Sequence, residues 1–195
     1  MTRKIAFDYD RAVDKATRLF WKKGYTETGL RDLLKVMQIG EGSFYNTLKS
    51  KKQLYLACLQ RYEETVVETR LQALAAAPTA AEGIRAFFRA VLDRLDIPST
   101  PSRLCMLAAM ASEDVLVEAS LRTRARTSLE ALEQLFGERL NQDRDNGALP
   151  RSLDPSTTAQ VIVTYLQGLW RRAVVDYDRS RFERQIDAFL TALGL

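Results

Sequence analysis

The fold of the N-terminal part of this 195-residue chain is decided by residues 24–54, which read GYTETGLRDLLKVMQIGEGSFYNTLKSKKQL. Two segments with apolar residues at helical spacing flank a tight polar turn at residues 38–40. A start signal at Thr28 opens the first segment, and the second runs from Glu41 to Leu48. Helices that cross steeply need apolar residues on both facing sides. The shared core is therefore expected to contain Leu30, Leu33, Met37, Phe44 and Leu48. This spacing is typical of a helix-turn-helix, whose second helix enters the major groove of DNA.

At this stretch the chain resembles the TetR family of bacterial transcriptional repressors. The matching residues are Gly24, Tyr25, Thr28, Asp32, Leu33, Ile39, Gly42, Ser43, Phe44, Tyr45, Ser50, Lys51 and Leu54. The departures are Gly29, Leu34, Met37, Gln38, Gly40 and Leu48. Gln38 stands where the turn Gly is usual, and a left-handed backbone favours Gly or Asn. We expect Gly40 nearby to absorb some of that strain.

The resemblance implies an all-α fold of about nine helices along essentially the whole chain. Residues 1–55 would form a three-helix helix-turn-helix DNA-binding domain, and residues 56–195 a larger ligand-binding and dimerisation domain. Apolar periodicity and the Pro and Gly breaks predict the helices independently. They are expected at residues 10–23, 28–37, 41–48, 50–76, 79–95, 103–111, 114–143, 155–175 and from 178 or 180 to 193.

The polar face of the second helix is expected to meet DNA. Asn46 has the donor and acceptor needed to pair with adenine. Lys51 lies at a helix start, where its charge and the helix dipole favour a phosphate. Thr28 is in the family a phosphate contact, although it can also serve as a cap alone, and Tyr45 can bind a phosphate or simply pack. The predicted DNA contacts are Thr28, Arg31, Gly42, Ser43, Tyr45, Asn46, Thr47, Lys49, Lys51 and Lys52.

Basic residues are concentrated at the same end of the chain. Residues 1–55 hold twelve Lys and Arg against six Asp and Glu, whereas residues 56–195 hold seventeen against nineteen. A basic excess confined to one end predicts attraction to phosphates, with a merely solvated surface as the alternative. DNA affinity would then fall with salt, with a log-log slope of roughly −0.9 per neutralised phosphate.

A single helix-turn-helix reads too few base pairs for specificity, so a homodimer on a palindromic double-stranded operator is expected. The resemblance implies a four-helix bundle built from the last two helices of each subunit. The expected interface residues are Val161, Leu169, Phe182, Ile186, Phe189 and Leu190. Periodicity does not separate this role from a place in the protomer's own core.

The resemblance also implies a small-molecule effector, of unknown identity, that favours a conformer fitting the operator poorly. Aromatic and methionine side chains at helical spacing offer an apolar pocket, but such a stripe can equally be plain core. The candidate pocket residues are Phe87, Phe88, Arg103, Cys105, Met106, Met110, Tyr165, Gln167 and Trp170.

Cys105 has a second interpretation. It follows Arg103 near a predicted helix start, where positive charge favours the reactive thiolate. Some relatives sense electrophiles or oxidants through such a cysteine, and a redox-sensing or electrophile-sensing repressor is therefore an alternative to a ligand-responsive one. A small buried core residue is the plainer interpretation, and Cys58 is expected to be core. Two cysteines form no disulfide framework and are expected to be reduced.

Other classes of protein are disfavoured. The chain contains no histidine, which removes Ser-His-Asp, Cys-His and most imidazole-based zinc sites. No Gly-rich phosphate loop follows a strand. We expect no catalytic residue, no metal and no cofactor. A helical interaction protein that does not bind DNA remains an alternative, and so does activation of transcription.

Nothing in the sequence indicates a membrane protein. No apolar run approaches the roughly 18 residues needed to span a bilayer, and residues 1–8 lack the apolar core of a signal peptide. A cytoplasmic location is expected.

Overall fold

The computed structural model describes residues 7–195. Residues 1–6 lie outside the described residues. They make up most of the N-terminal segment that is expected not to be a signal peptide. The described part is helical without strands, which confirms the predicted all-α class. No helix within it is both long enough and apolar enough to cross a bilayer.

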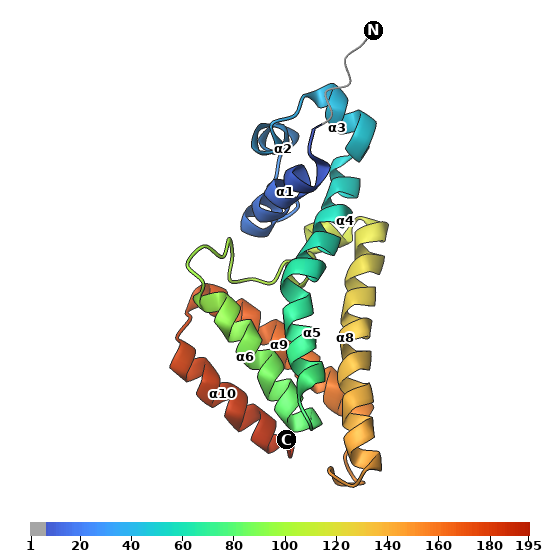
Figure 1. The fold of residues 1–195 in the computed structure, drawn as a ribbon, viewed down its shortest axis with the longest axis vertical. Coiled ribbons are helices and arrows are strands. Elements are labelled where there is room, and N and C mark those ends of the chain that lie inside the picture. Colours follow the sequence, from blue (N-terminus) through green and yellow to red (C-terminus); the bar gives the residue numbers. More distant parts are fainter. Residues whose placement is uncertain (1–6) are drawn as a thin grey trace.

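The helices follow one another in the predicted order (Figure 1). Their bounds are α1 (Tyr9–Lys23), α2 (Leu30–Met37), α3 (Glu41–Leu48), α4 (Lys51–Tyr62), the π-helix η1 (Glu63–Val67), α5 (Glu68–Ala76), α6 (Ala80–Asp96), the 3₁₀ turn η2 (Ala108–Met110), α7 (Glu113–Leu116), α8 (Ala119–Asp145), α9 (Pro155–Val175) and α10 (Arg179–Ala192).

The molecule is elongated, with α1 to α3 at one end (Figure 1). The run α4, η1 and α5 is continuous over residues 51–76 and leads from that end into the body formed by α6, α8, α9 and α10. Buried aromatic contacts follow the same route, since the ring centroids of Phe20 and Tyr55 are 4.9 Å apart and those of Trp21 and Tyr62 are 4.8 Å apart. Residues 7–55, called the module, and the body therefore share one continuous apolar core.

Two helix predictions are wrong. Residues 103–111 form turns and only a short 3₁₀ segment, because the Leu104 amide donates to Ser102 Oγ at 3.1 Å and its carbonyl accepts from Trp21 Nε1 at 2.8 Å. Backbone groups satisfied in this way do not need a helix. The predicted helix 114–143 is divided, because Glu118 has an extended backbone (ψ 108°) between α7 and α8.

Helices α5 and α6 pack closely in the body. Gly83 permits this approach, because a Cβ at this position would lie 2.6 Å from the Leu74 carbonyl oxygen. Buried Asp143 of α8 accepts from the Ala80 amide at 2.6 Å and so satisfies the N-terminus of α6 from outside. These contacts fix the positions of α5, α6 and α8 relative to one another.

Candidate DNA-binding and effector sites

Helix α3 separates an apolar face from a polar one. Phe44 and Leu48 are buried against the module core. Tyr45 is 48% exposed, Asn46 and Thr47 are exposed, and Ser43 is half-buried. The polar side chains predicted to meet DNA thus share the outward face of α3 at one end of the molecule (Figure 1).

The turn between α2 and α3 places strain on Gln38 itself. Its backbone is left-handed, with φ 61° and ψ 41°, while Gly40 has an ordinary φ of −78°. The expectation that Gly40 absorbs the strain is therefore wrong. Gln38 has a compensating contact, because its Oε1 accepts from Lys15 Nζ at 2.9 Å and ties the turn to α1.

A second strained residue ends α3. Lys49 has φ 65° and ψ −51°, and the Ser50 amide donates to the Leu48 carbonyl at 2.7 Å across it. This is a γ-turn, a rare and strained conformation. Strained backbone of this kind gathers at binding sites. The turn fixes the angle between α3 and α4, and hence the direction in which the polar face of α3 points.

Thr28 does not have either predicted role. It is fully buried, its hydroxyl donates to the Gly24 carbonyl at 2.6 Å, and Gly29 occupies the N-cap of α2. A buried hydroxyl that already has its acceptor is not available to a phosphate. Thr28 is buried because the short segment between α1 and α2 places its side chain against the Gly24 carbonyl.

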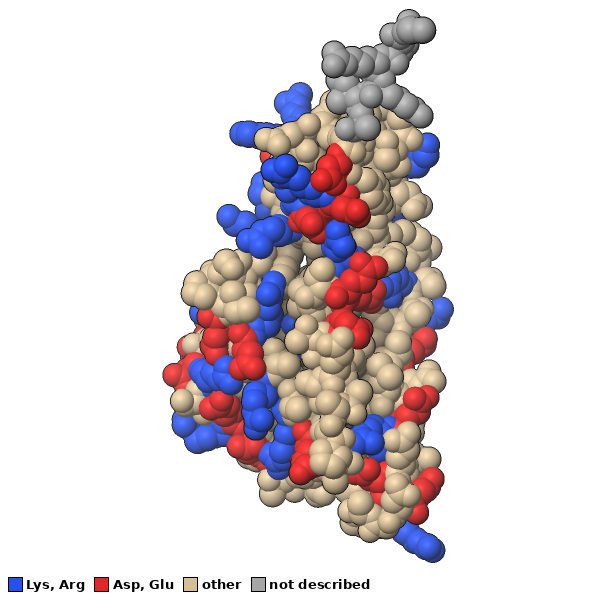
Figure 2. Space-filling view, in the orientation of Figure 1, with Lys and Arg blue, Asp and Glu red and all other residues tan. Residues whose placement is uncertain are grey.

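The predicted basic contacts differ in how free they are. Lys51 Nζ lies 4.5 Å from the centroid of the Tyr25 ring, and its partial burial lowers its pKa. Lys52 Nζ is 3.2 Å from the Glu118 carboxylate. Arg31 is exposed and makes no ion pair with any described residue. Figure 2 shows Lys and Arg protruding along the edge of α1 and α2, whereas both signs mix over the body.

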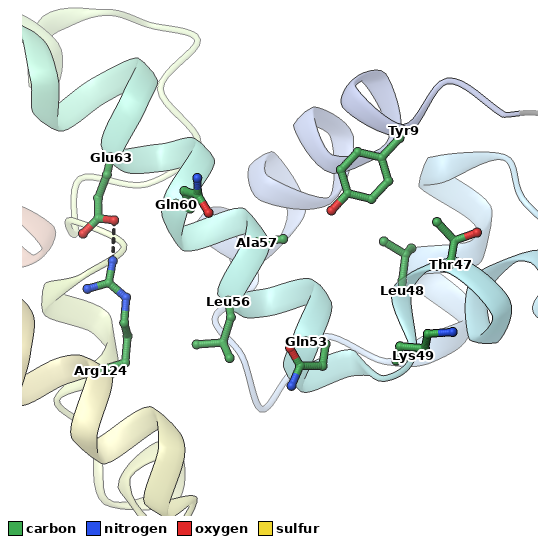
Figure 3. Close-up of a pocket in the computed structure, with 10 residues that line it drawn as sticks. All are labelled: Tyr9, Thr47, Leu48, Lys49, Gln53, Leu56, Ala57, Gln60, Glu63 and Arg124. Carbon is green, nitrogen blue, oxygen red and sulfur yellow. Dashed lines mark hydrogen bonds and ion pairs between the residues drawn. The ribbon is translucent and has the colours of Figure 1, made fainter.

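A groove of about 800 Å³ with a mixed polar and apolar lining lies between α3, α4, the start of α1 and the start of α8 (Figure 3). Thr47 and Lys49 line one end, and the Glu63–Arg124 ion pair closes the other. None of the predicted effector residues lines it. The groove borders the DNA face and separates it from α8.

Four predicted pocket residues meet around a different, small cavity of about 40 Å³ in the body. They are Phe87, Cys105, Gln167 and Trp170. Arg70 of α5 also lines this cavity and was missed. Its position was readable from the sequence, because Val66, Arg70 and Leu74 follow at intervals of four and therefore share the buried face of one helix.

The remaining predicted pocket residues do not line this cavity. Phe88, Met106 and Met110 are core residues. Tyr165 stacks on Phe189 with centroids 3.9 Å apart, and the Arg103 guanidinium lies 5.1 Å from the Tyr177 ring. Helical spacing identified buried positions, but it did not identify which of them face a common void.

The two cysteines have different surroundings. Cys105 is buried at the cavity, and its sulfur accepts from the Tyr62 hydroxyl at 3.4 Å. Cys58 is fully buried between α4 and α1, and burial raises its pKa to about 12. Both are free thiols, as expected.

Most of the predicted dimer residues pack inside the protomer. Val161 is 40% exposed and Phe189 is half-buried. The others, Leu169, Phe182, Ile186 and Leu190, are at most 6% exposed. Phe182, Ile186 and Leu190 bury α10 against α6, and Leu169 is buried on α9, so these four residues are corrected to protomer core.

Three side-chain contacts among the described residues link the helix-turn-helix module to residues 104–118 of the body. Trp21 Nε1 donates to the Leu104 carbonyl at 2.8 Å, one residue before Cys105. The Thr26 hydroxyl donates to Asp114 of α7. Lys52 pairs with Glu118, immediately before α8. The segment that carries the cavity residue Cys105 and the start of α8 is therefore tied to the module at three points.

No group of three or more potential metal ligands lies within residues 7–195. Two family models match the chain. The model described as "Bacterial regulatory proteins, tetR family" matches residues 12–58, and the one described as "Tetracyclin repressor-like, C-terminal domain" matches residues 80–189.

Individual proteins match along most of the chain. It is 27% identical to the HTH-type transcriptional regulator YezE of Bacillus subtilis, over 99% of this chain and 100% of that protein. It is 23% identical to the HTH-type transcriptional repressor DhaR of Mycobacterium sp., over 93% and 87%. A cysteine mutant of the regulator CifR, solved with 26-base-pair double-strand operator DNA, is 28% identical and superposes with a TM-score of 0.90 over 97% of this chain and 99% of that one. The chain therefore belongs to the TetR family of bacterial transcriptional regulators, a class of DNA-binding regulators and not of enzymes.

Proposed function

We propose that this protein is a repressor that binds a palindromic operator as a homodimer and leaves it when a small molecule binds. The observation that carries the proposal is the outward polar face of α3, made by Ser43, Tyr45, Asn46 and Thr47, in a chain whose backbone matches that of an operator-bound relative. DhaR is named a repressor, which favours repression over activation.

The DNA-binding unit is proposed to comprise residues 1–55, with residues 56–195 as the effector and dimer unit, working in the cytoplasm where the DNA is. Asn46 and Thr47 reach base edges, while Arg31, Lys49 and the Tyr45 hydroxyl hold phosphates. Gly42 lets the start of α3 approach the backbone. Lys49, Lys51 and Lys52 contribute less than Arg31, because each is already engaged within the protein: Lys49 Nζ donates to the Asn46 carbonyl at 2.7 Å, Lys51 lies over the Tyr25 ring, and Lys52 pairs with Glu118.

The dimer is proposed to form through the outer face of α9. Exposed residues recur there at helical spacing, and all of them except Arg171 are small or apolar, which suits helix packing. They are Val161, Thr164, Gly168, Arg171 and Val175. Val175 is 77% exposed in the protomer, which favours a partner surface over water.

The dimer can be tested without disturbing the protomer. A Cβ at residue 168 would meet no atom within 4 Å, and the residue is exposed, so Gly168→Arg should leave the protomer folded and block the approach of a second α9. Light scattering should then report a monomer, while Ala75→Arg on exposed α5 stays dimeric. A dimeric Gly168→Arg protein excludes this interface.

Effector release is proposed to act through the three contacts between body and module. A ligand that widens the cavity displaces α8 and the segment around Cys105, and both are tied to the module through Glu118 and Leu104. The two modules of a dimer then lose the spacing that a palindrome requires.

The DNA-binding proposal is tested by selecting duplexes from a random pool with the full-length protein and measuring affinity by fluorescence anisotropy. The selected sites should be palindromic. Asn46→Ala should lower the preference for them over random duplex by about 10-fold to 100-fold per base contact, the equivalent of roughly 1–3 kcal/mol. Asn141→Ala, an exposed Asn at the far end of α8, is the matched control. Absence of duplex binding in dilute buffer would reject the proposal and favour a helical interaction protein.

A second candidate is sensing through Cys105. The observation that favours it is the place of this thiol at the cavity, 3.4 Å from the Tyr62 hydroxyl and beside a buried guanidinium. Cysteines were also replaced in the operator-bound CifR structure. If an alkylating electrophile releases wild-type protein from DNA but leaves Cys105→Ser bound, Cys105 is the sensor. Equal release of both proteins excludes it.

A further inference from the structure

The body of the protein contains a buried cation without a counterion. Arg70 of α5 is only 3% exposed, and it makes no ion pair with any residue in the described range 7–195. Its Nε has no hydrogen-bond acceptor. A charged group taken out of water is costly unless it is paired, so an unpaired guanidinium in a core requires an explanation.

The neighbours of Arg70 compensate for this burial only in part. Its guanidinium carbon lies 5.5 Å from the centroid of the Trp170 ring, which is a cation–π contact. Burial alone would lower the pKa of the Arg70 guanidinium, but its contacts with Tyr62 and Cys105 raise it. The Tyr62 hydroxyl donates its proton to Cys105, and burial raises the pKa of Tyr62 far above neutrality. The tyrosine therefore supplies no negative charge at neutral pH.

The cavity next to Arg70 has an excess of donors. Trp170 Nε1 also lacks an acceptor although it is buried, and it lines the same void as Arg70. The Gln167 amide lines it as well. Ser128 is occupied elsewhere, because its hydroxyl donates to the Arg124 carbonyl at 3.0 Å. Arg70 Nε and Trp170 Nε1 are thus two donor atoms without an acceptor on residues that line the cavity, and no acidic side chain of residues 7–195 lines it.

From this arrangement we propose that Arg70 and Trp170 bind the carboxylate of a small-molecule effector, whose apolar remainder lies against Leu107, Leu129 and Leu132. A guanidinium presents two parallel N–H groups to a carboxylate, and the indole N–H supplies a third donor. The inference rests on the proposed function, because it names the chemical class of ligand that the cavity takes.

The charge balance selects a carboxylate over a phosphate. Within the described part of the chain, Arg70 is the only basic side chain that lines the cavity. One guanidinium neutralises one negative charge, whereas a dianionic phosphate would leave a second charge buried without a partner. The three leucines likewise favour a ligand with an apolar part over a free inorganic ion.

The size of the cavity connects ligand binding to a change of shape. A void of about 40 Å³ holds a carboxylate group but no complete effector, since ligand pockets usually measure roughly 300–1,000 Å³. The rest of the ligand must move Leu129 and Leu132 of α8 outward. Because α8 begins directly after Glu118, the partner of Lys52, this movement reaches the DNA-binding module.

The test compares acids with neutral molecules of the same shape on the full-length protein. Butyrate, benzoate and phenylacetate are titrated by calorimetry beside butyramide, benzamide and phenylacetamide. Wild type should bind at least one acid tenfold or more tightly than its amide. Arg70→Met should lose this preference, and the matched control Arg139→Met, on α8 away from the cavity, should keep it.

Thermal stability provides an independent readout. If Arg70 is an unpaired cation, Arg70→Met without ligand should melt at the same temperature as wild type or higher, and a large fall in Tm would contradict that description. If Arg70→Met fails to fold, the comparison of acid and amide binding to the wild-type protein still tests the inference. Equal binding of acid and amide, or no stabilisation by any of the three acids at millimolar concentration, overturns the inference.

Duplex affinity is measured separately in the same samples. Acids that bind through Arg70 without altering DNA affinity would support the carboxylate site and refute effector release. Neutral amides that release DNA as well as the acids would leave the proposed function standing and overturn the carboxylate assignment.

Discussion

Arg31→Gln should weaken the salt dependence of DNA binding by a calculable amount. Arg31 lies in the first turn of α2, is exposed, and has no ion-pair partner among the described residues, so its charge is available to a phosphate. Each phosphate neutralised contributes roughly 0.9 to the slope of log K against log salt. A homodimer carries two copies of the contact, and the slope should fall by about 1.8.

Two matched variants make this prediction specific. Lys52→Gln should change the slope less, because the ammonium of Lys52 already pairs with Glu118 at 3.2 Å. Arg151→Gln, in the exposed loop between α8 and α9 at the far end of the body, should not change it. The assay is fluorescence anisotropy of a labelled random duplex titrated at several salt concentrations. If Arg31→Gln keeps the wild-type slope, or Arg151→Gln lowers it equally, the placement of the phosphate contacts is refuted.

Further predictions concern packing, thiol reactivity and the contact between module and body. Gly83→Ala should lower Tm, because steric displacement of α5 costs about 1–3 kcal/mol and exceeds the gain in helix propensity of about 1 kcal/mol. Gly137→Ala on α8, where a Cβ would make only an ordinary 3.8 Å contact with Ala159, should raise Tm, and a Gly83→Ala protein as stable as wild type would show that the helices separate freely. Native Cys58 should resist iodoacetamide at neutral pH, since burial raises its pKa to about 12, and mass spectrometry should detect its alkylation only after unfolding. Trp21→Phe removes the donor to the Leu104 carbonyl and should lower the free energy of unfolding by about 1–3 kcal/mol in urea denaturation.

Local sequence signals were reliable where one segment decides its own structure. The α2 and α3 pattern predicted the helix-turn-helix because its apolar spacing, turn and polar face all lie within residues 24–54. The left-handed turn was predicted too, although Gln38 takes the strain without help from Gly40. Thr28 failed as a predicted contact because burial of its hydroxyl depends on the path of the chain from Gly24.

The effector site could be predicted only in part. Phe87, Cys105, Gln167 and Trp170 were chosen for chemistry and periodicity, and the structure brings these four to one cavity. Phe88 and Met106, chosen on the same grounds, are ordinary core. Neighbouring helix positions differ by about 100° in direction, so a small error in helix rotation moves a side chain from a cavity to the core.

What the amino-acid sequence determined by itself was therefore the local order: the helices, the DNA-reading motif, the basic N-terminal end and the family. Tertiary structure alone decided which buried residues share a void, which lysines keep a free charge, and that the stripe of α10 is used within the protomer. The physical reason is how far apart in the sequence the interacting residues lie. Helix spacing and charge are properties of neighbouring residues, whereas the lone guanidinium of Arg70 becomes informative only when distant helices surround it without an acid.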